Sequence, residues 1–311
     1  MKLIQDFDVK GKRVLVRCDF NAPLDEKGEI EDDFRIKQAL PTIEYLIKKG
    51  AKVILMSHLA DNRSLVPIRK RLEQYLGKKE FVLLENLRRD SREEENDDNF
   101  AKELAKLADI YINDAFGTCH RAHASIVGVP KYLPSGAGFL LEREIKVLSK
   151  VLENPERPLV AIIGGAKIES KAKVIDKFFK IADQVLIGGK IAEAVSIISE
   201  KVHLPVDYKD GLDIGPKTIK IFSEIIKKAK TILWAGPLGK FEDSAYEQGT
   251  KQVAKLIVKN KKAFKIAGGG DTLFALAKFG LRDKFDHVST GGGAMLAFLG
   301  GEELPGLKAL E

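Results

Sequence analysis

Cysteine is almost absent from this 311-residue sequence, which contains only Cys18 and Cys119. Two cysteines are too few for a disulfide framework, and no Cys/His spacing resembles a zinc site. No apolar run approaches the ~20 residues that are needed to span a bilayer. Charged residues interrupt the apolar stretch of residues 1–17, and this interruption excludes a secretory signal. We therefore expect a cytoplasmic protein without membrane contact.

Aromatic residues are also scarce, at 7% with a single Trp, whereas the net charge is +7. A net positive charge is typical of proteins that bind nucleic acid or small anions. No RNA-binding aromatic run and no zinc finger accompanies the charge, so an anionic small molecule is favoured and no nucleic acid is expected. Hydrophobic residues at 44% and charged residues at 31% are an ordinary globular mixture, and the length predicts about two domains.

Short β-branched runs alternate with amphipathic helical patterns along the whole chain. The strand candidates are residues 13–17, 52–57, 81–84, 109–113, 159–163, 184–187, 202–206, 231–235, 264–268 and 287–290. Such alternation predicts βαβ units and a mostly parallel sheet, arranged either as one barrel or as two open sheets.

One helical stretch, residues 139–154, is long and lacks strand character, and Pro155 and Pro158 follow it. A helix that ends there suits a connector between two halves. We therefore predict an α/β protein with two doubly wound parallel-sheet domains joined by an interdomain helix. The domains comprise residues 1–150, which include the connector, and 151–311, whose extreme C-terminus is expected to pack back on the first domain.

Glycine is concentrated after strands in the second half. The clusters are Gly164-Gly165, Gly188-Gly189, Gly236 with Gly239, Gly268 to Gly270, and Gly291 to Gly293. Ligands of open α/β sheets bind outside the carboxyl ends of the strands, where glycine lets backbone N–H groups approach phosphate. Neither the dinucleotide nor the Walker glycine motif is present. The clusters predict a phosphate or nucleotide site of another kind.

Charged residues accompany these glycines. Lys167 and Lys171 share one face if helical, and beside Gly164 they favour phosphate contact over a surface role. Asp271 and Thr272 follow a glycine cluster at a predicted helix start. There the aspartate is equally suited to cap the helix or to bind Mg²⁺ with a nucleotide.

The first half carries arginine and histidine at the corresponding strand ends. The candidates are Asp19, Asn21, Arg35, His58, Arg88, Arg89, His120, Arg121 and His123. Because arginine suits bidentate recognition of phosphate or carboxylate, this edge predicts an anionic substrate. An anion site in one half and a nucleotide site in the other indicate a two-substrate kinase that closes over its ligands.

The chain resembles the phosphoglycerate kinase family. The motifs that carry the resemblance are RVLVRCDFNAPLD, DDFRI, KVILMSHL, LLENLR, NDAFGTCHRAHAS, YLPSGAGFL, IIGGAKIESK, GLDIGPKT, WAGPLGKFE, IAGGGDT and STGGGA. They follow the family's order from residue 13 to 294. The resemblance implies reversible phosphoryl transfer between 1,3-bisphosphoglycerate with ADP and 3-phosphoglycerate with ATP, Mg²⁺ accompanying the nucleotide, by a monomer. A non-catalytic nucleotide-binding or interaction protein on the same fold is the alternative.

The resemblance also implies site residues at the matching positions. The acid substrate would be bound by Asp19, Asn21, Arg35, His58, Arg88, His120 and Arg121. The nucleotide would be bound by Gly164, Lys171, Gly188, Gly189, Gly211, Leu212, Pro237, Glu242, Gly269, Gly270, Asp271 and Thr272. Asp271 would hold Mg²⁺, and Arg35, Lys167, Gly292 and Gly293 would surround the transferring phosphoryl group.

Three departures from the family pattern stand out. The family's SHLGRP reads SHLADN at residues 57–62, so Asp61 stands where the family has a phosphate-binding arginine, and Arg63 is the nearest substitute. The family's WNGP reads WAGP at residues 234–237. Segments are missing after Gly77, between Gly189 and Val202, and before Gly211, and part of the adenine pocket wall is expected to be lost with them.

Overall fold

The computed structural model describes residues 1–77, 79–166, 172–195 and 199–311. Its contacts divide the chain into two compact units. Unit 1 comprises Met1–Lys146 with Glu303–Glu311, and unit 2 comprises Val147–Glu302. The boundary between the two units, between Lys146 and Val147, lies within helix α4 (Phe139–Glu153). In the described part of the chain, no helix is long and apolar enough to cross a bilayer.

Unit 1 is built on a five-stranded sheet in the order β3-β2-β1-β4-β5, and every neighbouring pair is parallel. The strands are β1 (Arg13–Cys18), β2 (Lys52–Met56), β3 (Val82–Leu83), β4 (Ile110–Asp114) and β5 (Ser135–Ala137). Strand β1 is the central strand, and it is buried from its second residue onward. Its nearly continuous apolar run is what a parallel strand covered on both faces requires.

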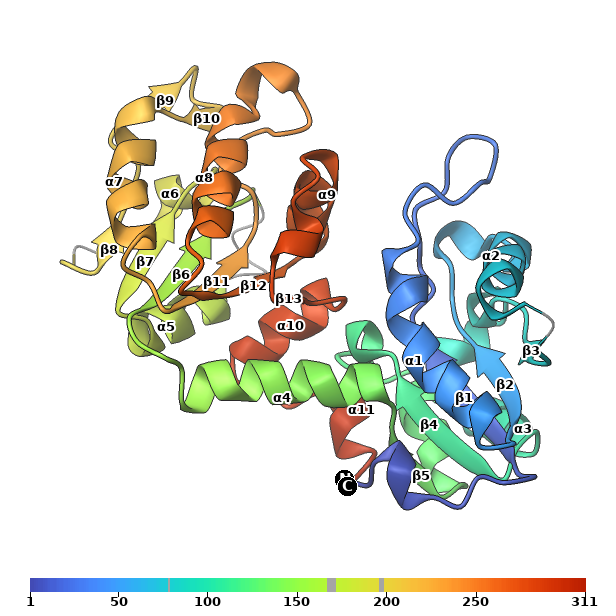
Figure 1. Ribbon diagram of the computed structural model, residues 1–311. Helices are drawn as coiled ribbons and strands as arrows, with labels where there is room; N and C mark the ends of the chain where they lie inside the picture. The colour runs from blue at the N-terminus through green and yellow to red at the C-terminus, as the bar shows by residue number, and fades with distance from the viewer. Residues whose placement is uncertain (78, 167–171, 196–198) are drawn as a thin grey trace. The chain divides into compact units, whose positions relative to one another are not determined.

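Helices cover both faces of this sheet (Figure 1). On one face lie α1 (Phe34–Lys48) and α2 (Val66–Leu76), whose Ile36, Ile43 and Leu72 join the same buried cluster as Val14 and Val16. The other face carries α3 (Asp98–Ala105), the short helical turns that follow β4, and α11 (Pro305–Lys308). The last helix is tied to unit 1, because Gly306 N donates to Cys119 O at 2.9 Å.

Unit 2 has a six-stranded parallel sheet in the order β13-β12-β11-β6-β7-β8. The strands are β6 (Leu159–Ile163), β7 (Gln184–Ile187), β8 (Val202–His203), β11 (Thr231–Ala235), β12 (Phe264–Gly268) and β13 (His287–Val288). A separate antiparallel hairpin consists of β9 (Tyr208–Lys209) and β10 (Asp213–Ile214). The parallel strands form two open sheets rather than one barrel, and the predicted α/β fold class is confirmed.

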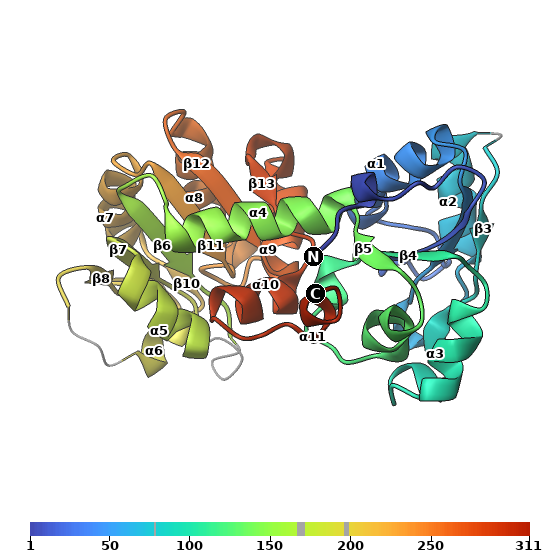
Figure 2. The same cartoon turned by 90° about the horizontal axis from the view of Figure 1, so that it is seen from below.

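The helices of unit 2 also form two layers. Helices α7 (Pro216–Ile226), α8 (Gln248–Lys259) and α9 (Gly270–Lys278) pack on one face, where Phe222, Val253 and Leu276 meet Trp234 in a common core. The opposite face carries α5 (Ala172–Ile181) and α10 (Gly292–Leu299), which contact each other. Helix α6 (Ile191–Ala194) is a short segment that follows β7 after the Gly188-Gly189 pair (Figure 2).

Each sheet has one place where the strand order reverses: between β1 and β4 in unit 1, and between β6 and β11 in unit 2. Connections leave in opposite directions at such a point, which opens a crevice at the carboxyl ends of the two strands. Residues after Cys18, Asp114, Ile163 and Ala235 border these crevices. The fold therefore provides one ligand-binding edge in each unit.

Candidate functional site

At the reversal point of unit 1, charged side chains gather where β1 ends. Asp19 is almost fully buried and forms an ion pair with Arg35, which stands in the first turn of α1. Burial is the largest single effect and opposes ionisation of this carboxyl, but the Arg35 guanidinium and smaller contributions from neighbouring groups together outweigh it and lower the pKa of Asp19. Asp19 Oδ1 also accepts from Asn21 N at 3.2 Å. Asp19 therefore orients Arg35 while remaining a carboxylate.

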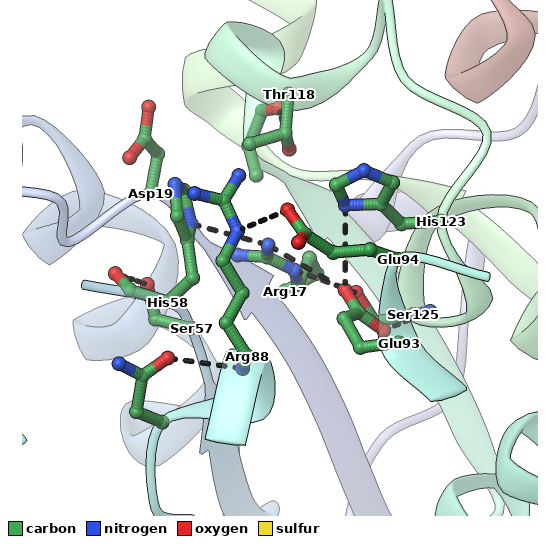
Figure 3. A network of polar contacts seen from close by, with 12 residues as sticks. Arg17, Asp19, Ser57, His58, Arg88, Glu93, Glu94, Thr118, His123 and Ser125 are labelled. Carbon is green, nitrogen blue, oxygen red and sulfur yellow. Dashed lines mark hydrogen bonds and ion pairs between the residues drawn. The ribbon is translucent and has the colours of Figure 1, made fainter. Parts of the chain in front are cut away.

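The loop after β2 is fastened to the loop after β1 by polar contacts. Ser57 Oγ accepts from Phe20 N and donates to Cys18 O, both at 2.8 Å. Asn21 Oδ1 accepts from Ala60 N at 3.0 Å. These bonds fix the backbone on both sides of His58, whose ring lies beside Asp19 (Figure 3).

Arg88 enters the same cluster from the turn after β3. Its backbone N–H donates to Asn86 Oδ1 at 3.1 Å, and its Nε forms an ion pair with Glu94 Oε1 at 3.1 Å. Burial and then the positive charge of Arg121 lower the pKa of Arg88. Its buried Nη2 has no hydrogen-bond partner among the residues that the structure describes. A partly buried guanidinium that faces a like charge and has a buried donor still unused is suited to an anionic ligand.

The segment after β4 supplies His120, Arg121 and His123. The His120 ring nitrogen Nε2 lies 3.4 Å from Arg121 Nε, from which it accepts. Burial lowers the pKa of His123 below its usual value, although the Glu93 carboxylate acts in the opposite sense. Glu93 Oε1 lies 3.9 Å from His123 Nδ1. All predicted acid-binding residues thus belong to unit 1 and follow the carboxyl ends of its strands, except Arg35, which reaches the cluster from α1.

Unit 2 contains a cavity of about 420 Å³ at the carboxyl ends of its strands. It is lined by Gly165, Ala166, Gly189, Lys190, Tyr208, Gly211, Leu212, Asp213, Pro237, Leu238, Gly239, Lys240, Glu242 and Asp271. The loops after β6, β7 and β11, the β9–β10 hairpin and the first turn of α9 contribute to it. Its size is in the range of small-molecule sites.

Glycine gives this cavity its shape. A side chain at Gly164 would place its Cβ 2.0 Å from Pro237 O, and one at Gly189 would lie 2.8 Å from Gly165 N and O. Gly189 also has a φ of +62°, which residues with side chains rarely adopt. Gly164 and Gly188 pack beneath the lining rather than within it. The loops after β6, β7 and β11 therefore touch backbone to backbone.

Helices α9 and α10 begin close together beside the cavity. A Cβ built on Gly292 would lie 3.4 Å from Gly269 Cα and from Gly270 N. The free N–H groups of a helix start favour anions, so Gly270, Gly292 and Gly293 form a region suited to phosphate. Asp271 is exposed and borders the cavity, whereas the Thr272 hydroxyl is buried and accepts from Gly236 N at 2.7 Å. Lys167 and Lys171 lie outside the described residues.

Several residues that shape these sites were not singled out from the sequence. In unit 1 they are Arg17, Ser57, Glu93 and Ser125, which are all fully buried. In unit 2 they are Lys190, Tyr208, Asp213 and Lys240. An arginine inside the apolar run RVLVR was a usable signal, because a fully buried arginine needs partners. Lys190, directly after Gly188-Gly189, was another.

Comparisons with known proteins agree with this arrangement. The family model described as phosphoglycerate kinase matches residues 4–82, 69–204 and 194–302. A phosphoglycerate kinase of Dictyoglomus turgidum is 43% identical, covering 99% of this chain and 98% of the relative, and one of Aquifex aeolicus is 43% identical over 100% and 98%. The match to the former runs over 387 residues, so the relative has segments that this 311-residue chain lacks.

Solved structures give the same result. A phosphoglycerate kinase from Coxiella burnetii superimposes with a TM-score of 0.86 at 34% identity, covering 99% of this chain and 98% of that one. A phosphoglycerate kinase from Pyrococcus horikoshii OT3 gives 0.89 at 30% identity, covering 100% and 98%.

Proposed function

Because this chain belongs to the phosphoglycerate kinase family, we propose that it catalyses the glycolytic transfer of a phosphoryl group from 1,3-bisphosphoglycerate to ADP, and the reverse reaction. A terminal phosphate oxygen of ADP attacks the acyl phosphorus, the bond from phosphorus to the acyl oxygen breaks, and 3-phosphoglycerate leaves as its carboxylate. In reverse, the carboxylate is the acceptor. A carboxylate is a good leaving group, so the step needs no strong general base.

The observation that carries the proposal is the pairing of two anion sites of different construction, one in each unit. In unit 1, Arg35, Arg88 and Arg121 would bind the phosphate and carboxylate of the acid substrate, together with Asp19, Asn21, His58 and His120. In unit 2, the glycine-lined cavity would take ADP or ATP, and Glu242 would accept from the ribose.

Around the transferring group, the protein's task is to align the substrates and stabilise charge on the equatorial oxygens. We assign this to the Arg35 guanidinium, to Lys167 and to the N–H groups of Gly292 and Gly293. Lys167→Ala is expected to lower kcat on the order of 10²-fold or more while ADP still binds, because such a contact acts mainly in the transition state.

The residues present fit Mg²⁺. This ion commonly binds through one or two carboxylates together with substrate phosphates, and Asp271 offers one exposed carboxylate at the edge of the cavity. When bound, Mg²⁺ would neutralise part of the phosphate charge. Asp271 would hold and orient the nucleotide through it.

We propose that the two units close on each other when both substrates are bound. The acid-binding residues belong to unit 1 and the nucleotide-binding residues to unit 2, whereas in-line transfer needs reacting atoms about 3–3.5 Å apart. Each ligand alone meets only half of the contacts, so closure should need both. Small-angle scattering should therefore show a smaller radius of gyration only in the ternary complex. We also propose that one chain suffices, so light scattering should give a mass near 34.4 kDa.

A coupled assay with ATP and 3-phosphoglycerate tests the proposal directly. We expect turnover that depends on both substrates and is lost in Arg35→Ala. Nucleotide binding without turnover would contradict catalysis and would support a non-catalytic nucleotide-binding protein instead.

A further inference from the structure

A buried row of polar side chains crosses unit 1 from Glu93 to His58 (Figure 3). Glu93 is fully buried, and its carboxylate accepts from Ser125 N at 2.9 Å and from Ser125 Oγ at 2.5 Å. Ser125 Oγ in turn accepts from Arg17 Nε at 2.8 Å. Arg17 Nη2 lies 3.3 Å from His58 Nδ1. We name these residues the Glu93–His58 row.

The direction of each hydrogen bond in this row is fixed by chemistry. The Ser125 hydroxyl has one proton, which it gives to Glu93, so its oxygen is left to accept from Arg17. Arginine has five N–H donors and no acceptor. His58 Nδ1 must therefore accept from Arg17, which leaves the imidazole proton on Nε2. Among the described residues no group accepts from Nε2, so this N–H is available to a ligand.

The surroundings of His58 also oppose a second proton on its ring. The charged groups that face it are Arg17 and Asp19 at the end of β1, Arg88 in the turn after β3, and Arg121 after β4. Burial, with the positive charge of Arg17 next in size, lowers the pKa of His58 to about 2, although Asp19 acts in the opposite sense. The ring is therefore neutral in the range in which an ordinary histidine, with a pKa of about 6.5, titrates.

We propose that Arg17, held by Ser125 and Glu93, is a positioning residue that keeps His58 in the neutral form with its proton on Nε2. His58 then presents a fixed, uncharged donor to an oxygen of the acid substrate. This inference rests on the proposed function for the identity of that substrate. The proposal further means that the affinity for the acid substrate should not change with pH in the way expected for a site that contains an ordinary titrating histidine.

The first test measures the ring itself and needs no activity. In the full-length protein, with its histidine rings isotopically labelled, nitrogen NMR distinguishes a protonated from an unprotonated ring nitrogen. The signals of His58 are identified by their loss in His58→Gln. We expect an unprotonated Nδ1 and a protonated Nε2 that do not change from about pH 5.5 to about pH 8. The opposite tautomer, or titration near 6.5, would overturn the proposal even if the enzyme turns over.

A second test separates positioning from general structural support. Ser125→Ala removes the acceptor of Arg17 Nε and the link from Arg17 to Glu93 through the serine hydroxyl, but it keeps every charge and the bond from Arg17 Nη1 to Cys18 O. We expect His58 to show a mixture of tautomers, and the KM for 3-phosphoglycerate to rise about threefold to tenfold with little change in kcat. Ser135→Ala is the matched control, because its hydroxyl donates to Leu133 O two residues away and takes no part in the Glu93–His58 row. An unchanged His58 spectrum in Ser125→Ala would contradict the role of the row.

Two substitutions at His58 complete the test by placing an amide donor at different depths. The amide nitrogen of Gln reaches the position of Nε2, whereas that of Asn reaches the position of Nδ1. We expect His58→Gln to bind 3-phosphoglycerate about threefold to tenfold more tightly than His58→Asn in calorimetry. If the wild-type ring acted as a cation, both variants would be equally weak, and wild-type affinity would fall as the pH rises through about 6.5.

Discussion

The two units use the same position in the same kind of sheet, but they build their anion sites from different materials. In unit 1 the site consists of charged side chains held by other buried side chains, as Asp19 holds Arg35 and Ser125 holds Arg17. In unit 2 it consists of glycine backbone packed on backbone, as Gly164 packs on Pro237. The first site should therefore be sensitive to the removal of atoms, and the second to their addition.

The largest effect is expected where removal strikes the side-chain site. Arg35→Ala takes away a proposed phosphoryl contact and leaves the buried Asp19 carboxylate without its ion pair. We expect kcat to fall on the order of 10²-fold or more, while ADP affinity is retained. The assay should include Arg13→Ala as a control, because Arg13 forms a surface ion pair with Asp109 and such pairs contribute little. Similar losses in both variants would refute a specific role for Arg35.

In the backbone-built site, addition of one methyl group should have the next largest effect. In Gly164→Ala the new Cβ would collide with Pro237 O at 2.0 Å, so the loop that lines the nucleotide cavity must move. We expect ADP to bind about tenfold more weakly or worse, and the free energy of unfolding to fall by roughly 1–3 kcal/mol. Calorimetry and urea unfolding measure the two effects.

Gly270→Ala controls for the substitution itself. Nothing lies within 4 Å of a Cβ at Gly270, which is the first residue of α9, and its unfolding free energy should hardly change. If Gly164→Ala lowered the free energy of unfolding no more than Gly270→Ala does, the contrast between the two sites would be wrong.

The same contrast explains how far the sequence predicted this structure. Each of the ten predicted strands overlaps an observed strand, because short apolar β-branched runs are a strong local signal. Strands β5, β9 and β10 were missed. Ser135–Ala137 consists of small residues, and β9 and β10 each contain a charged residue and lie outside any apolar run.

Site residues were predictable where they follow a strand. Glu93 and Ser125 were not, since they are 32 residues apart and meet only in the folded sheet. Of the cavity lining that the β9–β10 hairpin contributes, Gly211 and Leu212 were implied by the family resemblance. Tyr208 and Asp213 were missed, because they reach the cavity from an antiparallel hairpin rather than from the end of a parallel strand.

Asp271 gives an intermediate effect, because it is a side chain that serves the backbone-built site. Asp271→Asn removes one negative charge from the cavity edge without disturbing the core, as Asp271 is exposed. We expect the Mg²⁺ concentration for half-maximal activity to rise about tenfold, with smaller changes in ADP affinity when Mg²⁺ is absent. Asp283→Asn, at an exposed carboxylate in the turn after α9, should leave both unchanged. Equal Mg²⁺ requirements in the two variants would remove Asp271 from the metal site.

The two sites should also respond to pH with opposite signs. The pKa of Asp19 is lowered in the fold, so its stabilising contribution is present above the unfolded pKa of about 3.9 and is lost as the pH falls. Burial raises the pKa of Asp213 to about 6, so its contribution is greatest below about 3.9 and is lost as the pH rises through about 6. Urea unfolding at several pH values from about 3 to about 7 measures both effects. As the pH rises, the free energy of unfolding of the wild type should gain on that of Asp19→Asn. Over the same range, it should lose ground against that of Asp213→Asn. If these two stability differences changed with pH in the same direction, the opposite pKa shifts of Asp19 and Asp213 would be wrong.

The smallest effect is expected at Arg63, which tests whether unit 1 compensates for the arginine that its shortened loop lacks. The Arg63 side chain is exposed, and its structural contacts come from its backbone: its N–H donates to Ala60 O, and its O accepts from Asn86 Nδ2 at 2.8 Å. Those contacts survive truncation, so Arg63→Ala should change the KM for 3-phosphoglycerate by no more than about twofold. Arg88→Ala removes a partly buried guanidinium with an unused buried donor and should raise that KM at least about tenfold in the same assay. A rise in Arg63→Ala that approaches the one in Arg88→Ala would show that an exposed arginine is recruited when substrate binds. The side-chain site would then be completed by its ligand rather than formed in advance.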